Sequence, residues 1–181
     1  MSAVVVVVAI VLAADFVYVL GRARAEWRDG DDLSTATGWQ ITSLYVLTLA
    51  LLAIAVVWRP WPLDVPPAVA AIVGGALVLG GTALALPAFV PFASVRQLYG
   101  VERGELITAG IYRYSRNPQY TGLGVVLLGA AVVARSGLAL LVVAAYAVAI
   151  RVWLMVEEEH LSAAFGAEYD EYRRRTARFL G

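Results

Sequence analysis

The 181-residue sequence contains no cysteine and no lysine, and both absences exclude kinds of chemistry. Without cysteine the chain has no disulfide, no thiolate nucleophile, no Cys-ligated zinc and no iron–sulfur cluster. Without lysine it forms no Schiff base and has no phosphate-loop lysine, because all 14 basic residues are arginine. The single histidine, His160, excludes a multi-histidine metal site, so no metal is expected.

Charge is also scarce, since 15% of the residues are charged and 14 acidic residues balance the 14 arginines. Nucleic-acid binding requires an excess of basic residues on one face, so no nucleic-acid partner is expected. Apolar residues make up 61% of the chain, whereas soluble domains contain about 45–50%. A water-soluble single domain is therefore not expected.

The apolar residues gather in five runs of 16 to 20 residues. A helix of about 20 residues spans the roughly 30 Å hydrocarbon core of a bilayer. The sequence therefore predicts an all-α integral membrane protein with five transmembrane helices, folded as one membrane domain over residues 1–181. Arg135 to Gly137 join the last two runs, which predicts a tight helical hairpin. The runs lie at residues 3–20, 41–58, 67–86, 119–134 and 137–156.

The arginines are distributed unequally between the polar segments. Eleven lie in residues 21–40, in residues 93–118 and after residue 156, whereas the two opposite loops carry only Arg59 and Arg135. Arginine-rich loops remain in the cytoplasm. We therefore expect an uncleaved first helix with its N-terminus outside, a cytoplasmic C-terminus, and location in the cytoplasmic membrane of a bacterium.

The first polar cluster precedes the fourth apolar run. Asn117 followed by Pro118 predicts a helix start, in which the asparagine caps free amides and proline occupies the first helical position. Arg113 and Arg116 stand just before it, so an anionic group such as a carboxylate or phosphate is favoured there. The alternative is an interfacial anchor, with arginines on lipid phosphates and tyrosines in an aromatic belt.

The second polar cluster ends the fifth run. Arg151 lies about one and a half turns inside the membrane, where an arginine normally faces the protein interior and needs a partner. Glu158, seven residues on, projects from the same face, and Glu157 is offset by about 120°. This pattern indicates a ligand site with an anion at Arg151 and an ammonium at the glutamates. Alternatively, Arg151 snorkels to the surface and the glutamates solvate a helix end.

Two further patterns concern packing. Glycines 74, 75, 80 and 81 give the third run a small face suited to close helix contact. Residues 167–178 predict a short amphipathic helix with Tyr169 and Tyr172 on one face. We expect this helix to fold back on the cytoplasmic end, as a lid or a membrane-surface element.

The polar clusters resemble those of the isoprenylcysteine carboxyl methyltransferase and phospholipid methyltransferase group of integral-membrane enzymes. The resemblance rests on Leu-Ile-Thr-Ala-Gly-Ile-Tyr at 106–112 and Ser-Arg-Asn-Pro-Gln-Tyr-Thr-Gly at 115–122. It continues in Glu157-Glu158, Leu161, Phe165-Gly166, Glu168-Tyr169 and Tyr172. It covers about residues 92–180, so residues 92–181 would form the cofactor-binding and catalytic half and residues 1–91 a variable half.

The resemblance implies S-adenosylmethionine as cofactor, bound at the cytoplasmic end of the last spans, and a lipophilic or lipidated substrate that enters from the bilayer lipid. Glu157 or Glu158 would bind the cofactor ammonium, and Arg151 would meet a substrate carboxylate. Arg151 and Glu158 are thus the candidate catalytic residues. The other implied cofactor residues are Gln97, Leu106, Ile107, Tyr112, Asn117, Pro118 and Tyr120.

Two departures from the family pattern bear on the acceptor. Asn117 replaces the usual histidine and cannot titrate, so no general base is assigned there. The stretch around Gly80 lacks the further arginine of eukaryotic carboxyl methyltransferases. We expect O-methylation of a prenylcysteine-like carboxylate, with N-methylation of an ethanolamine phospholipid or S-methylation of a lipophilic thiol as alternatives. An NADPH-dependent membrane reductase and a non-catalytic membrane protein are the alternatives outside methyl transfer.

Overall fold

The computed structural model describes residues 2–30, 32–92, 94–98, 101–102 and 104–180, and its regular elements within these ranges are helices. The only strand-like pairing in these ranges is an isolated bridge between Pro62 and Ser136. The elements are α1 Ser2–Arg28, α2 Thr35–Trp58, α3 Pro67–Phe89, α4 Val95–Leu98, the 3-10 helix η1 Gly110–Arg113, α5 Pro118–Ala134, α6 Gly137–Phe165 and α7 Ala167–Arg175.

Four of these helices are long and apolar enough to cross a bilayer: α1, α2, α3 and α6. The fifth predicted span corresponds to α5, which is a shorter apolar helix of 17 residues. At 1.5 Å per residue it rises roughly 26 Å. The all-helical membrane class is therefore confirmed, with four spans of full length and one shorter apolar helix in the described ranges.

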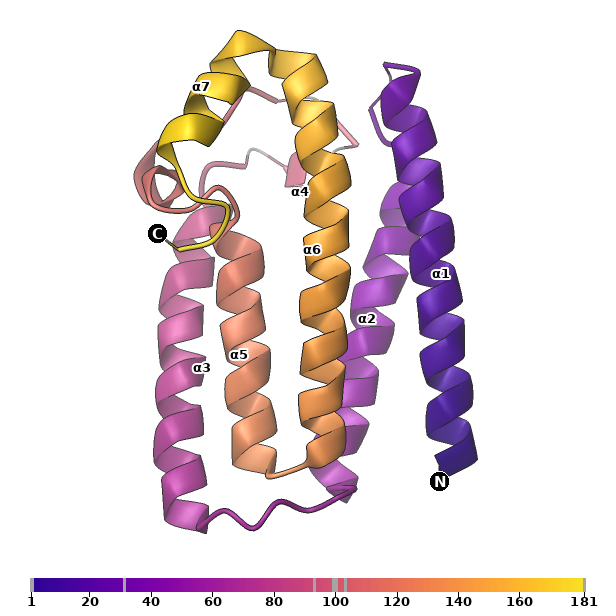
Figure 1. Cartoon of the computed structure of the whole chain (residues 1–181), viewed down its shortest axis with the longest axis vertical. Helices are drawn as coiled ribbons and strands as arrows, with labels where there is room; N and C mark the ends of the chain where they lie inside the picture. Colours follow the sequence, from indigo (N-terminus) through magenta and orange to yellow (C-terminus); the bar gives the residue numbers. More distant parts are fainter. Residues whose placement is uncertain (1, 31, 93, 99–100, 103, 181) are drawn as a thin grey trace.

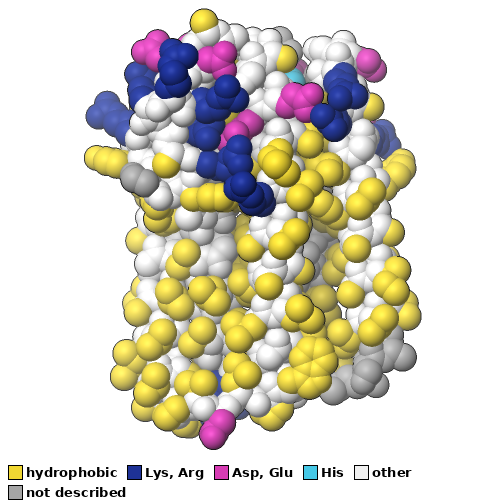
Figure 2. Space-filling model, in the orientation of Figure 1, with side chains coloured by type: hydrophobic (Ala, Val, Ile, Leu, Met, Phe, Trp, Pro, Cys, Tyr) yellow, Lys and Arg dark blue, Asp and Glu magenta, His cyan; other side chains and the backbone are white. Residues whose placement is uncertain are grey.

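The long helices run side by side along the longest axis of the molecule (Figure 1). The α1–α2 loop, the segment between α3 and α5, α7 and the C-terminal segment lie at one end. The N-terminus, the α2–α3 loop and the α5–α6 turn lie at the other. Charged side chains gather at the end that carries α7, while apolar side chains cover the shafts of the helices (Figure 2). This separation of charged and apolar surface suits a bilayer around the shafts. Which end is cytoplasmic stays a prediction.

Helices α3 and α5 pack against each other through glycines. A Cβ on Gly81 would lie 2.7 Å from the carbonyl oxygen of Gly122, and a Cβ on Gly74 would lie 2.7 Å from that of Gly129. The two backbones are thus in direct contact, as small residues permit in membrane helices. The predicted packing role is confirmed for Gly74 and Gly81, whereas a Cβ on Gly75 or Gly80 would meet nothing within 4 Å.

The predicted hairpin between α5 and α6 is also present. Arg135 takes a left-handed conformation with φ of 52°, which ends α5. The Ser136 side chain then accepts a hydrogen bond from the Ala139 amide at 3.3 Å and so caps α6. The same hydroxyl donates to the carbonyl of Pro60 at 3.0 Å. The hairpin is therefore bound to the loop that connects α2 and α3.

Helix α1 extends past its apolar run and is held at the charged end. The Glu26 carboxylate accepts hydrogen bonds from the Ser34 amide and the Thr37 hydroxyl, both at 2.8 Å, which fastens the start of α2 to α1. On another face of α1, Trp27 is buried, and its ring centroid lies 5.5 Å from that of Trp153 of α6. These contacts bring α1 beside the polar end of α6.

Candidate functional site

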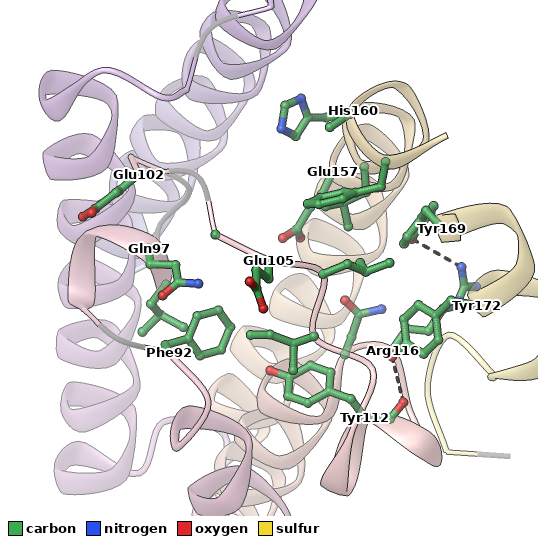
Figure 3. A pocket seen from close by; sticks show the side chains of 18 of the residues that line it. Phe92, Gln97, Glu102, Glu105, Tyr112, Arg116, Glu157, His160, Tyr169 and Tyr172 are labelled. Carbon is green, nitrogen blue, oxygen red and sulfur yellow. Dashed lines mark hydrogen bonds between the residues drawn. The ribbon is translucent and has the colours of Figure 1, made fainter. Parts of the chain in front are cut away.

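A polar cavity of about 160 Å³ opens at the charged end of the molecule. Its walls come from the segment between α3 and α5, from the ends of α1 and α6, and from α7. In Figure 3, Phe92, Gln97 and Tyr112 lie across the cavity from Glu157. The structure places six of the predicted cofactor residues in its walls: Gln97, Leu106, Ile107, Tyr112, Asn117 and Glu157.

Tyr112 of η1 forms a fixed part of this wall. Its hydroxyl lies 3.0 Å from the Ala88 carbonyl of α3, to which it donates, and its own carbonyl accepts from the Tyr172 hydroxyl of α7 at 2.7 Å. Burial raises the pKa of Tyr112 above the usual value, so the ring remains neutral at physiological pH. The wall is therefore tied to helices on both of its sides.

Glu157 presents an unpaired carboxylate oxygen to the cavity. The side chain is half-buried on α6, and its Oε2 atom is shielded from solvent and has no hydrogen-bond partner. The carboxylate points toward the middle of the cavity (Figure 3). A buried carboxylate oxygen without a partner is costly unless a ligand supplies a donor, and a cationic donor gives the strongest contact.

Arg116 lies on another wall and has one unused donor. Its side chain is 9% exposed, and its Nη1 lies 3.2 Å from Glu158 Oε1 and donates to the Tyr169 hydroxyl at 3.5 Å. Its Nε atom is buried without a partner. Since α5 begins directly after it, at Pro118, the helix dipole adds to the positive potential. Arg116 Nε is therefore an available donor for the anionic group that is predicted to bind before this helix.

Glu158, predicted as a catalytic residue, lines neither cavity described here. Its side chain is 7% exposed and is bound by Arg178, whose Nε donates to Oε1 at 2.9 Å and whose Nη2 donates to Oε2 at 2.7 Å. These bonds raise the pKa of the Arg178 guanidinium. Glu158 thus joins α6 to the C-terminal segment, and its expected place in the ligand site is not what the structure shows.

Arg151 was expected to face the interior, and that expectation is wrong. The side chain is exposed and lines neither cavity. Val148 and Met155 on the same face of α6 are also exposed, at 67% and 48%. Seven residues further on, the same face is covered by the C-terminal segment, which explains why Glu158 is buried. The role of Arg151 in substrate binding stays an untested prediction.

Asn117 and Pro118 begin α5 as predicted, with proline at the first helical position. The asparagine side chain makes no capping hydrogen bond, which corrects that expectation. Its Nδ2 instead donates to the carbonyl of Arg178 at 3.0 Å. Pro118 is fully buried and lines neither cavity, and its contact with a cofactor stays a prediction.

An apolar cavity of about 650 Å³ lies between α1, α2, α5 and α6. Tyr120, predicted as a cofactor residue, lines this cavity and not the polar one. Among the described residues in its walls, Glu157 is the one that carries a charge. The two cavities share four wall residues and therefore adjoin: Trp27, Leu98, Gln119 and Glu157.

Sequence reasoning did not assign several residues that line the polar cavity or hold its surroundings in place. Trp27 and Asp32 come from the first helix and the loop after it, which carried no recognisable motif. His160 stacks on Trp27 with ring centroids 4.8 Å apart. Arg178 lies 20 residues beyond Glu158, with no local pattern that links the two. Within the described ranges, no group of three or more His, Asp or Glu side chains is arranged to hold a metal.

Comparison with known proteins yields one family. A family model described as phospholipid methyltransferase matches residues 69–168, which is more than half of the chain. The match runs from α3 to the first turn of α7 and includes the cavity-lining loop and Glu157. Comparison with curated proteins and with solved structures gives no match.

Proposed function

Since the chain belongs to the phospholipid methyltransferase family, we propose that it transfers a methyl group from S-adenosylmethionine in the polar cavity to a lipophilic acceptor in the apolar cavity. The observation that carries this proposal is the position of Glu157, which lines both cavities. Its unpaired oxygen marks where a cationic group is favoured beside the apolar chamber.

The polar cavity has features that suit the amino-acid part of this cofactor. The cofactor carries an ammonium and a carboxylate on one carbon. Glu157 would bind the ammonium, and the free Nε of Arg116 would bind the carboxylate beside the start of α5. The described walls also carry three further acids, Asp32, Glu102 and Glu105, against Arg116 as their one arginine. This acidic excess favours a cofactor with a net positive charge.

When bound, S-adenosylmethionine supplies a methyl group on a cationic sulfur that is already activated for displacement. Glu157 and Arg116 would fix the position of the methyl donor, while the apolar walls hold the acceptor and exclude water. The cofactor would supply its methyl carbon to the acceptor's lone pair, and the electrons of the broken carbon–sulfur bond would remain on sulfur. The protein's contribution is therefore alignment of the two reactants.

The walls of the apolar cavity favour an uncharged acceptor head, and an amine foremost. A carboxylate there would face Glu157 without an arginine among the described wall residues. An ammonium head must first lose one proton, to Glu157 or to water, because only the free amine has a lone pair for the methyl carbon. The methylated product then carries the positive charge that leaves the sulfur. The carboxylate acceptor expected from the sequence depended on Arg151, which lines neither cavity.

The direct experiment incubates the purified protein with methyl-labelled S-adenosylmethionine and total membrane lipid, followed by mass identification of the labelled lipid. We expect a label that is stable to base, as an N-methyl group is. A base-labile label would indicate an ester and would overturn the amine assignment. Absence of both labelled lipid and calorimetric binding of S-adenosylmethionine would overturn the function, and binding of NADPH instead would favour a reductase.

The variant Glu157→Gln tests the cofactor contact. Loss of a charge-assisted hydrogen bond of about 1.5–3 kcal/mol should weaken S-adenosylmethionine binding about 10- to 100-fold, as measured by calorimetry. The matched control is Glu159→Gln, because Glu159 is an exposed neighbour that pairs with Arg24 at 2.8 Å. Equal affinities of the two variants would contradict the assignment of Glu157.

A further inference from the structure

The segment after α7 folds back against the residues that precede α5. Figure 1 shows it returning from α7 toward the start of α5. The Arg116 amide donates to the carbonyl of Ala177 at 2.9 Å, and the Asn117 side chain donates to the carbonyl of Arg178 at 3.0 Å. The backbone of residues 177–178 is therefore fixed beside the wall that carries Arg116.

This placement brings two guanidinium groups to one buried carboxylate. Arg178 occupies both oxygens of Glu158, at 2.9 and 2.7 Å. Arg116 makes one longer contact to the same group, with 3.2 Å between Nη1 and Oε1. Both oxygens of Glu158 are thus bound by Arg178, and the Nε of Arg116 is left without a partner although the side chain is nine-tenths buried.

Two cations around one anion leave a positive charge on the Arg116 side of the cluster. If Arg178 were absent, the buried Glu158 carboxylate would have Arg116 as its remaining cation in the described surroundings. Arginine and carboxylate prefer a two-bond geometry, so Arg116 would turn its donors toward Glu158. Its Nε would then no longer be free at the cavity wall.

We propose that Arg178 is a positioning residue that satisfies Glu158 and thereby keeps Arg116 available for the carboxylate of the cofactor. This inference rests on the proposed function, because it concerns the amino-acid part of S-adenosylmethionine. Arg178 itself lines neither cavity and acts through Arg116. The Arg116 guanidinium also donates to the hydroxyl of Tyr169 of α7 (Figure 3). Tyr169 in turn packs in an edge contact with Tyr172.

The test compares two ligands by calorimetry on the full chain: S-adenosylmethionine and its decarboxylated analogue, which keeps the amine and lacks the carboxylate. The wild type should bind S-adenosylmethionine more tightly than the analogue. In Arg178→Gln this preference should fall about tenfold, since one charged hydrogen bond is lost. Affinity for the analogue should change less than about threefold, because Glu157 still binds the amine.

Two variants serve as controls. Arg175→Gln removes an exposed arginine of α7 that pairs only weakly with Glu171, at 4.0 Å, and should leave the preference unchanged. The double variant Glu158→Gln, Arg178→Gln removes the carboxylate that would draw Arg116 away, so it should recover the preference. Arg178→Lys keeps the charge but offers no two-bond contact, so its preference for S-adenosylmethionine over the analogue should lie between those of the wild type and Arg178→Gln.

Several outcomes would overturn the inference. An unchanged preference in Arg178→Gln would do so, as would equal loss of affinity for both ligands, which is the result of a purely structural role. Failure of the double variant to recover the preference, or a wild type that does not distinguish the ligands, would also overturn it. If Arg178→Gln does not fold, the ligand preferences of Arg178→Lys and of the double variant test the inference instead. A wild type that binds neither ligand contradicts the proposed function itself.

Discussion

Three adjacent glutamates at the end of α6 have three different environments. Successive residues of a helix are rotated by about 100°, so each side chain leaves the helix in its own direction. Glu157 faces the polar cavity, Glu158 meets Arg178, and Glu159 pairs with Arg24 of α1. A run that by composition solvates a helix end therefore contains one cavity-lining carboxylate and two carboxylates in ion pairs.

Arg151 provides a prediction at the same scale. Because its side chain is exposed and lines neither cavity, Arg151→Gln should change cofactor affinity and the rate of methyl transfer less than about twofold, as exposed substitutions usually do. Calorimetry and the initial rate of lipid labelling measure the two quantities. Loss of transfer with intact cofactor affinity would instead support the substrate role predicted from the sequence.

At the scale of elements, the pair α3 and α5 is the most closely packed part of the described structure. A Cβ at position 81 would meet backbone atoms Gly122 O and Val126 N, both at 2.7 Å, which cannot move independently of α5. Gly81→Ala should therefore force the helices apart, at a cost of about 1–3 kcal/mol, and lower the midpoint of thermal unfolding in detergent by several degrees.

The neighbouring glycine is the matched control for this substitution. A Cβ on Gly80 would meet nothing within 4 Å, so Gly80→Ala should leave the midpoint unchanged or raise it slightly. Equal midpoints for the two variants would show that the contact between α3 and α5 does not limit stability.

The existence of the helices followed from the apolar runs, but several ends did not. The first and fifth apolar runs stop at residues 20 and 156, before the charge clusters, whereas α1 continues to Arg28 and α6 to Phe165. Their polar turns are held by contacts such as Glu26 on α2 and Glu158 on Arg178. Conversely, α7 ends at Arg175 rather than at the predicted residue 178, because the next residues reach back to Glu158 and Asn117.

The site was predictable where its residues are close in sequence. Five residues predicted between positions 97 and 117 line one side of the polar cavity, and Glu157 of the glutamate pair lies across from them. Helical spacing also put Arg151 and Glu158 on one face, but it carried no information about which parts of that face would be covered. Long-range partners such as Trp27 and Arg178 depend on packing between distant segments, for which a single sequence holds no local pattern.

At the scale of the whole molecule, the two cavities draw on different parts of the chain. The family match begins at residue 69, so it leaves out α1 and α2. These two helices nevertheless supply a large share of the apolar cavity, including Phe16, Leu44 and Leu51. Differences in acceptor between relatives are therefore expected to lie in this first part of the chain.

Filling the apolar cavity should separate acceptor binding from cofactor binding. Ala149 of α6 lines this cavity, so Ala149→Phe should lower methyl transfer at least about tenfold by excluding the acceptor, with S-adenosylmethionine affinity unchanged. Ala147→Phe is the control, because Ala147 is exposed and lines neither cavity. Equal transfer rates in the two variants would place the acceptor elsewhere.

The acidic lining of the polar cavity also bears on turnover. With the proposed cofactor, the ligand's sulfur would be a cation before transfer and a neutral thioether afterwards, so the attraction exerted by Asp32, Glu102 and Glu105 would weaken in the same step. We therefore expect the spent ligand to leave more readily than the fresh one. Because these acids lie near solvent, dissolved salt should screen the difference and make repeated cycles slower at high ionic strength.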